Sequence, residues 1–446
     1  MSAAIEQWGS RYGFILATIG GAVGIGNIWR FSYVAGENGG AVFLFIYLAF
    51  VFFIGVPLMI AELAIGRHAK GDAISAFEIS GKTSRWRGVG WLGILAAVLL
   101  LSYYAVIAGW ALKYFAGAVT GDLWRAAGAG YGGYFEEFIS HSGEPLIWQA
   151  VVLMMASLIV VGGVRQGIER LNRILIPVLA VIIIVLAGFS LSLPNSDVGV
   201  SFLLTPDWSV LTKPEVYAAA LGQAFFTLGI GMVFFITYGS YMPRTFSVPT
   251  SAIIIAAGDT AFAIIAGLAI FPAVFAFGGN PAAGPELAFV TLPQVFLEMP
   301  AGPVVGSVFF LLLAAAAITS MVALLEIPVA ALIHRTHYTR RQAAIGMTFC
   351  VFLLGVPSAL SYGVLSDIRF GTHGILDAID YSVSNFLLPV TGILTALYVG
   401  WRFDRAKLLQ ETDLGDSRLG VFWLWLVRIL VPAAILGILI KSAETL

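Results

Sequence analysis

Several polar groups of this chain lie inside long apolar stretches, where their types and spacing favour ion chemistry. Thr319 and Ser320 form a pair of hydroxyls within the run AAAAITSMVALL, and Arg30, Asp259 and Asp380 are ionisable residues in similarly apolar surroundings. Hydroxyl and carboxylate oxygens are ligands that hard cations take, although a hydroxyl in a helix can also bond back to its own backbone. Ionisable residues in apolar spans commonly mark ion or substrate pathways. These groups therefore predict such a pathway.

Two identical tripeptides interrupt apolar helical sequence. Gly24-Ile25-Gly26 lies in GGAVGIGNIWRF, and Gly229-Ile230-Gly231 lies 205 residues later in AFFTLGIGMVFF. Glycine destabilises a helix interior, and in lipid unwound backbone survives only where it lines a cavity or is buried in protein. Half-helix N-termini at such a break can meet an anionic group, and freed carbonyls can coordinate cations. The pair predicts a binding site near the membrane midplane, although small residues also allow close helix packing.

The composition is that of a membrane protein. Of 446 residues, 59% are hydrophobic and only 11% are Asp, Glu, Lys or Arg, whereas soluble chains are about 25% charged. The net charge of −1 excludes a nucleic-acid-binding protein and a peripheral protein held by charge. The single cysteine, Cys350, excludes an intrachain disulfide and a cysteine metal site.

Apolar segments long enough to cross a bilayer predict an all-α polytopic membrane protein with about eleven transmembrane helices. The segments cover residues 11–36, 40–66, 88–119, 147–163, 168–192, 216–242, 249–277, 302–334, 341–358, 375–401 and 420–440, joined by short loops. Adding 205 to the starts of the first five gives the approximate starts of the next five. We therefore expect one transporter domain, built as an inverted repeat of residues 11–192 and 216–401 with helices 1 and 6 unwound, plus an eleventh helix over 420–440.

The basic residues predict the orientation of the chain. Loops on the side of the N-terminus carry most of the Lys and Arg residues, while the opposite loops carry only Arg125, Lys213, Arg369 and Lys441. By the positive-inside rule, the N-terminus is cytoplasmic and the C-terminus, after an odd number of spans, is extracytoplasmic. The expected location is the inner (plasma) membrane of the cell.

The sequence resembles the bacterial neurotransmitter:sodium symporters, the family with the LeuT-type fold. The resemblance runs from about Gln7 to the last span and rests on ordered motifs, among them QWGSRYGFILATIGGAVGIGNIWRF, PLMIAELAIGR, GQAFFTLGIGM, AITSMVALLE and AIDYSVSNFLLP. It implies alternating access, in which inward sodium movement drives the uptake of an amino acid across the lipid bilayer. It also implies a protein that is not an enzyme and uses no organic cofactor.

The same resemblance implies two sodium sites, both made of oxygen ligands. The first would use the Ala22 carbonyl, the Asn27 amide oxygen, the Thr227 carbonyl and hydroxyl, and a side-chain oxygen of Asp259, completed by the substrate carboxylate. The second would use the carbonyls of Gly20, Val23 and Ala316 and the hydroxyls of Thr319 and Ser320.

The resemblance also implies an amino-acid subsite. The substrate carboxylate would meet the amides of Ile25 and Gly26 and the Tyr104 hydroxyl, and its ammonium would meet the carbonyls of Ala22, Phe226 and Thr227. The side chain would face Leu100, Tyr104, Phe226, Gly229, Met232, Ser320 and Leu324. No charge lies in that set, so desolvation disfavours charged side chains. Gly24, where amine-transporting relatives typically carry Asp, favours a true α-amino acid. With the uncharged lining, the subsite predicts a neutral and hydrophobic L-amino acid.

Gates on both sides of the site follow from the resemblance. Arg30 and Asp380 would close the outer side, with Gln223 nearby and Phe226 as a lid. Trp8, Ser240 and Tyr241 keep the inner-gate neighbours of the family. However, Ile5 and His334 replace the Arg and Asp that usually pair there, so either the gate is weaker or another pair, using Glu6 or Arg11, closes it.

One further expectation concerns anions. Relatives that bind chloride do so near positions matching Tyr47, Gln223, Thr227, Asp259 and Ala263. Asp259 supplies a fixed negative charge there, and Ala263 cannot donate the hydrogen bond that a serine would, so transport is expected to be independent of chloride. We expect structural roles for the embedded Glu62 and Glu326.

Parts of the sequence are also compatible with three other functions. An ion channel could use the same broken helices, but the repeat and the gate pair favour alternating access. An intramembrane enzyme could use Asp259, Asp380 and His373, but no nucleophile–base or metal-ligand spacing appears. A carrier of the same fold could be driven by protons, although Thr319 and Ser320 favour sodium. The sequence leaves the oligomeric state open.

Overall fold

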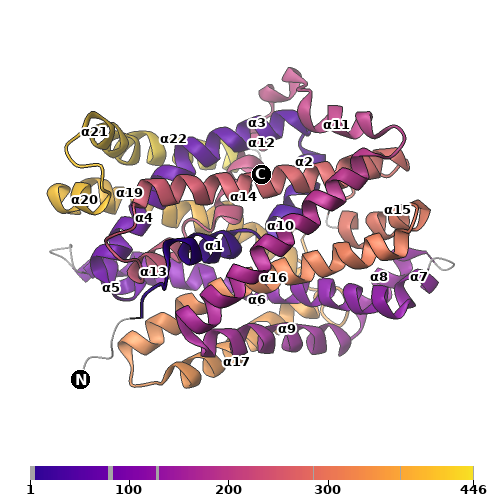
Figure 1. Cartoon of the computed structure of the whole chain (residues 1–446), viewed down its shortest axis with the longest axis horizontal. Helices are drawn as coiled ribbons and strands as arrows, with labels where there is room; N and C mark the ends of the chain where they lie inside the picture. Colours follow the sequence, from indigo (N-terminus) through magenta and orange to yellow (C-terminus); the bar gives the residue numbers. More distant parts are fainter. Residues whose placement is uncertain (1–5, 79–83, 127–129, 285, 372, 445–446) are drawn as a thin grey trace.

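The computed structural model describes residues 6–78, 84–126, 130–284, 286–371 and 373–444. Within these residues the chain is helical without β-strands, apart from an isolated bridge between Phe370 and His373. Most of the long helices run roughly along one axis, which is horizontal in Figure 1, while the helix over Arg170–Leu191 crosses them diagonally. This confirms the predicted all-α membrane architecture.

Nine helices within the described ranges are long and apolar enough to cross a membrane. Their bounds differ from the predicted segments by a few residues. They are Ala41–Ala69, Arg87–Thr120, Glu144–Val161, Val164–Leu191, Val248–Ala276, Gly302–Arg335, Arg340–Ala359, Ile375–Trp401 and Arg418–Lys441. The first predicted span is a pair of helices bent by 54°. The sixth is divided into two shorter helices, so the count of eleven stays a prediction.

Several of these spans are composite. The individual α-helices are α3 (Ala41–Phe50), α4 (Val56–Ala69), α6 (Arg87–Thr120), α9 (Glu144–Val161), α10 (Arg170–Leu191), α14 (Val248–Ala276), α16 (Gly302–Arg335), α17 (Arg340–Ala359), α18 (Ile375–Ser382), α19 (Leu388–Trp401), α21 (Arg418–Trp425) and α22 (Val431–Glu444). π-Helical turns join α3 to α4, α18 to α19 and α21 to α22, and another precedes α10; these turns are Val51–Gly55, Val383–Leu387, Leu426–Leu430 and Val164–Glu169.

The connections contain more helix than the sequence predicted. Short helices between the spans are α5 (Ala73–Glu78), α7 (Asp122–Arg125), α8 (Tyr131–Ser140), α11 (Ser196–Leu204), α15 (Leu292–Glu298) and α20 (Arg405–Glu411), with a π-helical turn at Leu287–Thr291 and 3₁₀ turns at Ser84–Trp86 and Trp208–Thr212. These helices are too short, and too polar at their ends, to be membrane spans, so hydropathy alone predicts loops there.

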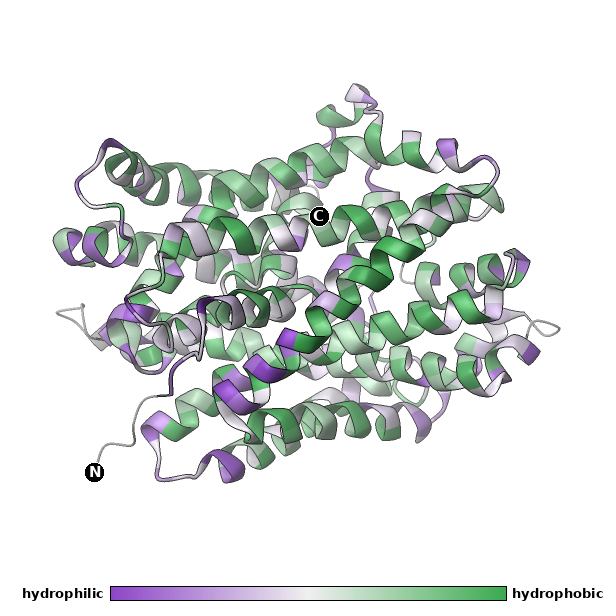
Figure 2. Ribbon diagram, in the orientation of Figure 1, coloured by the Kyte–Doolittle hydropathy of each residue, from purple (hydrophilic) through white to green (hydrophobic). Residues whose placement is uncertain are grey.

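The centre of the bundle is made by α6 and α16. In each, 83% of the most apolar stretch is buried, compared with 33% for the spans containing α10, α17 and α22. Away from their ends these outer helices expose mainly large apolar side chains, and Figure 2 shows this along the flanks of the bundle. Because such side chains would be unfavourable in water, the flanks are the surface that faces lipid.

A buried arginine joins early and late parts of the chain at the end of the bundle where Trp8 lies, which we call the N-terminal end. Arg67, at the end of α4, is 1% exposed. Its Nε lies 3.1 Å from Glu411 Oε2, its Nη2 lies 3.0 Å from Asp413 Oδ1, and its Nη1 donates to the Phe246 carbonyl at 2.7 Å. A buried charge needs such partners, so this cluster fixes α4, α20 and the segment before α14 together.

Candidate functional site

The first break lies between α1 (Arg11–Ala22) and a π-helical turn (Gly26–Arg30) that leads into α2 (Phe31–Glu37). Val23 is extended, with φ −69° and ψ 111°. The Gly24 amide donates to Asn27 Oδ1 at 3.1 Å and not to a backbone carbonyl of α1. A Cβ on Gly24 would lie 2.3 Å from Ser320 Oγ and 2.4 Å from the Tyr104 hydroxyl. Glycine is therefore needed here for close approach.

The second break lies between α12 (Pro214–Leu228) and α13 (Phe234–Ser240). Gly229 and Gly231 have φ of +74° and +82°, in the left-handed region that favours glycine. The freed amide of Gly231 donates to Glu62 Oε1 at 3.1 Å. Glu62 is fully buried. Its side chain supports the unwound backbone through this hydrogen bond.

Residues predicted for the first sodium site meet where the two breaks approach α14. Asn27 Nδ2 lies 2.7 Å from Asp259 Oδ1, and the Thr227 hydroxyl donates to both carboxylate oxygens of Asp259 at 3.1–3.2 Å. All three side chains are buried. The Asn27 oxygen, which was the predicted ligand, accepts from the Gly24 amide at 3.1 Å. The carboxylate and hydroxyl oxygens beside it are of the type that a monovalent hard cation takes.

Residues predicted for the second sodium site meet where α1 approaches α16. The Val23 carbonyl accepts from the Ser320 hydroxyl at 3.3 Å and lies 3.5 Å from the Thr319 hydroxyl. The Thr319 hydroxyl also donates to the Ala316 carbonyl at 2.8 Å. The structure thus gathers four of the five predicted groups, and the fifth residue, Gly20, lies two residues before the end of α1. These neutral oxygens fit a cation of single charge.

A small cavity of about 20 Å³ lies between the breaks. Ten of the twelve residues predicted for the substrate line it, namely Ala22, Gly24, Gly26, Leu100, Tyr104, Phe226, Gly229, Met232, Ser320 and Leu324. Ile25 and Thr227 do not, although the Ile25 amide donates to the Tyr104 hydroxyl at 2.9 Å. Gly21, Phe234 and Ala323 also line it and were not predicted.

These three omissions have a common cause. A Cβ on Gly21 would lie 2.5 Å from the Phe234 ring and 2.9 Å from the Ala323 Cβ, so the three residues share one wall. Their closeness depends on how α1, α13 and α16 pack. The one signal in the sequence was that Gly21 and Phe234 each lie within a few residues of a Gly-Ile-Gly break.

The cavity is closed toward the opposite end of the bundle by the predicted outer-gate residues. Arg30 Nε lies 3.8 Å from Asp380 Oδ2, and Arg30 Nη1 donates to Gln223 Oε1 at 2.8 Å. The Arg30 guanidinium lies 4.7 Å from the centre of the Phe226 ring. Gln223 in turn donates to the Gly26 carbonyl at 2.9 Å, which links this gate to the first break.

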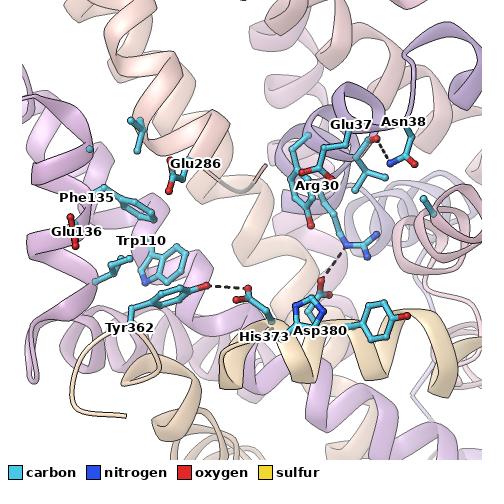
Figure 3. Close-up of a pocket in the computed structure, with 18 of the residues that line it drawn as sticks. Arg30, Glu37, Asn38, Trp110, Phe135, Glu136, Glu286, Tyr362, His373 and Asp380 are labelled. Atoms are coloured by element: carbon cyan, nitrogen blue, oxygen red, sulfur yellow. Dashed lines mark hydrogen bonds and ion pairs between the residues drawn. The ribbon is translucent and has the colours of Figure 1, made fainter. Parts of the chain in front are cut away.

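Beyond the gate lies a vestibule of about 810 Å³. Figure 3 shows Arg30 and Asp380 joined as an ion pair at one side of it, with Glu37, Glu136 and Glu286 elsewhere along its walls. Phe226 and the Arg30–Asp380 pair lie between this vestibule and the small cavity and separate the two.

The N-terminal end is closed by the segment before α1. Trp8 is 4% exposed; its indole donates to the Tyr238 carbonyl at 3.0 Å and its amide donates to the Tyr241 carbonyl at 3.2 Å. The Tyr241 hydroxyl donates to Glu326 Oε1 at 2.7 Å. Trp8 and Tyr241, the predicted inner-gate residues, are therefore in contact beneath α13.

An ion-pair chain completes this closure. Arg340 Nη1 lies 2.7 Å from Glu326 Oε2, and Arg340 Nε lies 3.0 Å from Glu6 Oε1. Glu6 Oε2 also accepts from the Val164 amide at 2.7 Å. Ile5 lies outside the described residues. His334 points elsewhere, with Nδ1 3.4 Å from Asp72 Oδ2, which Arg335 also contacts at 2.7 Å. Sequence reasoning named Glu6 but missed Arg340.

Two facing breaks at the centre of a helical membrane bundle, with contacts closing both sides, define a transporter of the LeuT-type fold. The chain belongs to the sodium:neurotransmitter symporter family, whose model matches residues 5–132 and 134–446. This confirms a sodium-dependent transporter rather than an enzyme.

Individual proteins agree with this assignment. The chain is 39% identical over 433 residues to the uncharacterized sodium-dependent transporter YhdH of Bacillus subtilis, covering 96% of each chain. It is 27% identical over 488 residues to the sodium-dependent serotonin transporter of Drosophila melanogaster, covering 98% of this chain and 76% of the fly protein. It is also similar to the crystal structure of MhsT in complex with L-phenylalanine, with a TM-score of 0.93, 49% identity and coverage of 98% and 99%.

Proposed function

We propose that this protein couples inward sodium movement, through two sodium sites, to the uptake of a neutral and hydrophobic L-amino acid by alternating access. The observation that carries the proposal is the meeting of two oxygen clusters beside one small cavity. Asn27, Thr227 and Asp259 form one cluster, and Val23 and Ser320 belong to the other. Ions bound in both would share backbone with the cavity, which provides the physical link between ion and substrate binding.

The lining of the cavity supports a hydrophobic amino acid. Its residues include no charged side chain, so a charged substrate side chain would lose its hydration without compensation. The cavity itself is only about 20 Å³, so Met232 and Phe226 must move to admit a substrate; the flexible thioether of Met232 suits this. The L-phenylalanine in the MhsT complex supports the same substrate class.

Crowding at Gly24 argues against amines that lack a carboxylate. A side chain at Gly24 would meet both Ser320 Oγ and the Tyr104 hydroxyl within 2.4 Å. Gly24 itself carries no carboxylate that could replace that of the substrate. The Ile25 amide and the Tyr104 hydroxyl, already 2.9 Å apart, are the donors proposed for the substrate carboxylate.

Transport is proposed to be independent of chloride. Asp259 is fully buried beside Asn27 and Thr227, where it supplies a negative charge next to the first cation. Ala263 lies one turn further along α14, is also buried, and has no hydrogen-bond donor on its side chain. Replacing chloride by gluconate should leave uptake unchanged in the wild type. Asp259→Ser with Ala263→Ser should weaken uptake and make the remainder depend on chloride.

The protein is proposed to span the inner membrane of the cell. In the proposed orientation its N-terminal end faces the cytoplasm. Arg165, Arg170, Arg244 and Arg402 lie in or beside connections at that end, as the positive-inside rule requires. The vestibule then opens to the outside, and the Glu6–Arg340–Glu326 chain is the cytoplasmic gate.

Uptake into proteoliposomes tests the proposal. Labelled L-phenylalanine should accumulate when sodium is higher outside than inside, and the other amino acids should compete in order of hydrophobicity. Accumulation driven by a pH gradient without sodium would instead indicate a proton-driven carrier. Sodium leak without concentrative uptake would indicate a channel.

A further inference from the structure

The contact between α1 and α10 contains oxygen atoms that the sites above do not use. Asn172, on α10, is completely buried, and its Oδ1 accepts no hydrogen bond from any described residue. Its Nδ2 donates to the Ile168 carbonyl at 2.9 Å, which fixes the amide so that Oδ1 points away from its own helix. A buried amide oxygen without a donor is costly, so its orientation requires an explanation.

Asn172 Oδ1 points at Gly20, whose carbonyl is a proposed ligand of the second sodium site. A Cβ on Gly20 would lie 1.9 Å from this oxygen. Because Cβ positions tilt toward the N-terminus of a helix while carbonyls point toward its C-terminus, Asn172 Oδ1 lies on the N-terminal side of the Gly20 carbonyl. It is thus displaced from the site toward the N-terminal end of the bundle.

The next oxygen in that direction belongs to Glu169. A Cβ on Gly13, seven residues before Gly20 on α1, would lie 1.9 Å from Glu169 Oε1. Two glycines on one face of α1 therefore each receive an oxygen-bearing side chain from α10 or its preceding turn. Glu169 is 2% exposed, and its carboxylate accepts from the Gly9 amide at 2.7 Å and from the Ser10 hydroxyl at 3.0 Å.

Glu169 also lines a cavity of about 430 Å³ at the N-terminal end. Arg165, Arg170 and Arg173 surround this cavity and are exposed, so water screens their charge. Glu169 Oε1 also lies 3.9 Å from Arg173 Nη1, so a cation that reached the buried carboxylate would compete with this arginine. The positive charges of the arginines would therefore favour release of the cation into water.

We propose that Asn172 Oδ1 is a transient ligand for the sodium ion that leaves the second site, passing it from the Gly20 carbonyl toward Glu169 and the cavity. This inference rests on the proposed function and adds a residue to it. Asn172 touches the ion only during release, so it affects the rate of net transport rather than equilibrium binding of sodium.

The test uses Asn172→Leu, which keeps the approximate size of the side chain and removes the oxygen, in proteoliposomes. Two rates of labelled L-phenylalanine movement are compared. Net uptake down a sodium gradient requires sodium release, whereas exchange with unlabelled L-phenylalanine, at saturating sodium on both sides, does not. Loss of one ligand to a charged group should slow net uptake by about tenfold and leave exchange within about twofold of wild type. Half-saturating external sodium should not change.

Ser190→Ala is the matched control, because Ser190 is another buried α10 residue whose hydroxyl lacks a described partner. It should keep the wild-type ratio of net uptake to exchange. Equal loss of both rates in Asn172→Leu would mean that Asn172 only supports packing, and wild-type behaviour in both would mean that sodium leaves by another route.

A second variant keeps the inference testable if Asn172→Leu does not fold. Asn172→Asp retains an oxygen and adds a charge, so it should hold the ion longer and make net uptake more sensitive to inhibition by internal sodium. Unchanged sensitivity would overturn the inference. Absence of sodium-driven uptake in the wild type would instead contradict the proposed function.

Discussion

The two helix breaks share the tripeptide Gly-Ile-Gly but use it differently. In the first break, Gly24 and Gly26 are needed for space: added Cβ atoms would meet Ser320 and Tyr104 at one position and the Phe226 ring, at 2.7 Å, at the other. In the second break, Gly229 and Gly231 are needed for their positive φ. Identical tripeptides 205 residues apart can therefore meet different physical requirements.

The attachment of the two flanking half-helices also differs. α13 packs backbone to backbone on α4, since a Cβ on Gly66 would lie 2.1 Å from the Ile236 carbonyl and one on Gly239 would lie 2.7 Å from the Leu63 carbonyl. α1 is held at its start through the side chains of Trp8, Ser10 and Glu169. Side-chain contacts separate more easily than interlocked backbones, so α1 is the half-helix better suited to move.

The largest expected effect is on folding, from Gly231→Ala. The new Cβ would lie 2.2 Å from the Leu388 carbonyl oxygen, and left-handed backbone costs an L-residue roughly 1–2 kcal/mol. The midpoint of thermal unfolding in detergent should fall by about 5 °C or more. Gly188→Ala on α10, where a Cβ meets nothing within 4 Å, should not lower it.

Gly24→Ala should instead remove transport and leave the fold intact. Its Cβ would meet the ends of two side chains, which can shift, rather than fixed backbone. Uptake should fall by about 100-fold, because the shift displaces Ser320 and Tyr104 from the site, while the unfolding midpoint stays near that of the wild type. If Gly24→Ala unfolded like Gly231→Ala, the distinction between the two breaks would be lost.

Removing hydroxyls beside the first break should change the sodium dependence of uptake, whereas removing one beside the second break should not. Thr319→Ala with Ser320→Ala deletes two oxygens that contact Val23 in the first break, and half-saturating sodium should rise by about tenfold or more. Thr237→Ala is the control beside the second break, because the Thr237 hydroxyl bonds to its own helix at Val233. Sodium titration of uptake distinguishes them; wild-type dependence in the double variant would contradict the assigned site.

The smallest expected effect is on the tether of α1. Glu6→Gln weakens the 3.0 Å pair with Arg340, and a partly exposed pair contributes about 0–1 kcal/mol. The inward-open population without sodium should rise by up to about fivefold. Modification of an introduced cysteine, with Cys350 replaced, measures this.

The matched control for the tether is Asp416→Asn, which breaks the exposed Arg405–Asp416 pair at the same end. It should leave accessibility unchanged. Equal accessibility of the wild type and the Glu6→Gln variant would show that Trp8 alone holds the segment.

The sequence was sufficient for features set by local composition. Most of the spans could be predicted because backbone facing lipid must satisfy its own hydrogen bonds in long apolar helices, and Thr319 and Ser320 stood out because hydroxyl pairs are conspicuous in such a run. The Glu6–Arg340 pair could not be predicted, since its partners are 334 residues apart and either could have faced water. Asn172 gave no signal either, because its meaning depends on a glycine in another helix.

The Arg67 cluster has a consequence for biosynthesis. Arg67 enters the membrane region early, but Glu411 follows 344 residues later. Burial works to raise the pKa of Glu411, yet hydrogen bonds from His68 and Arg244 outweigh it, so the pKa lies below its usual value once Glu411 has packed beside Arg67. Until then the guanidinium lacks its main counter-charge, at a cost of several kcal/mol if it is buried. A chain cut short before α20 should therefore remain open at this end, with Arg67 exposed to water.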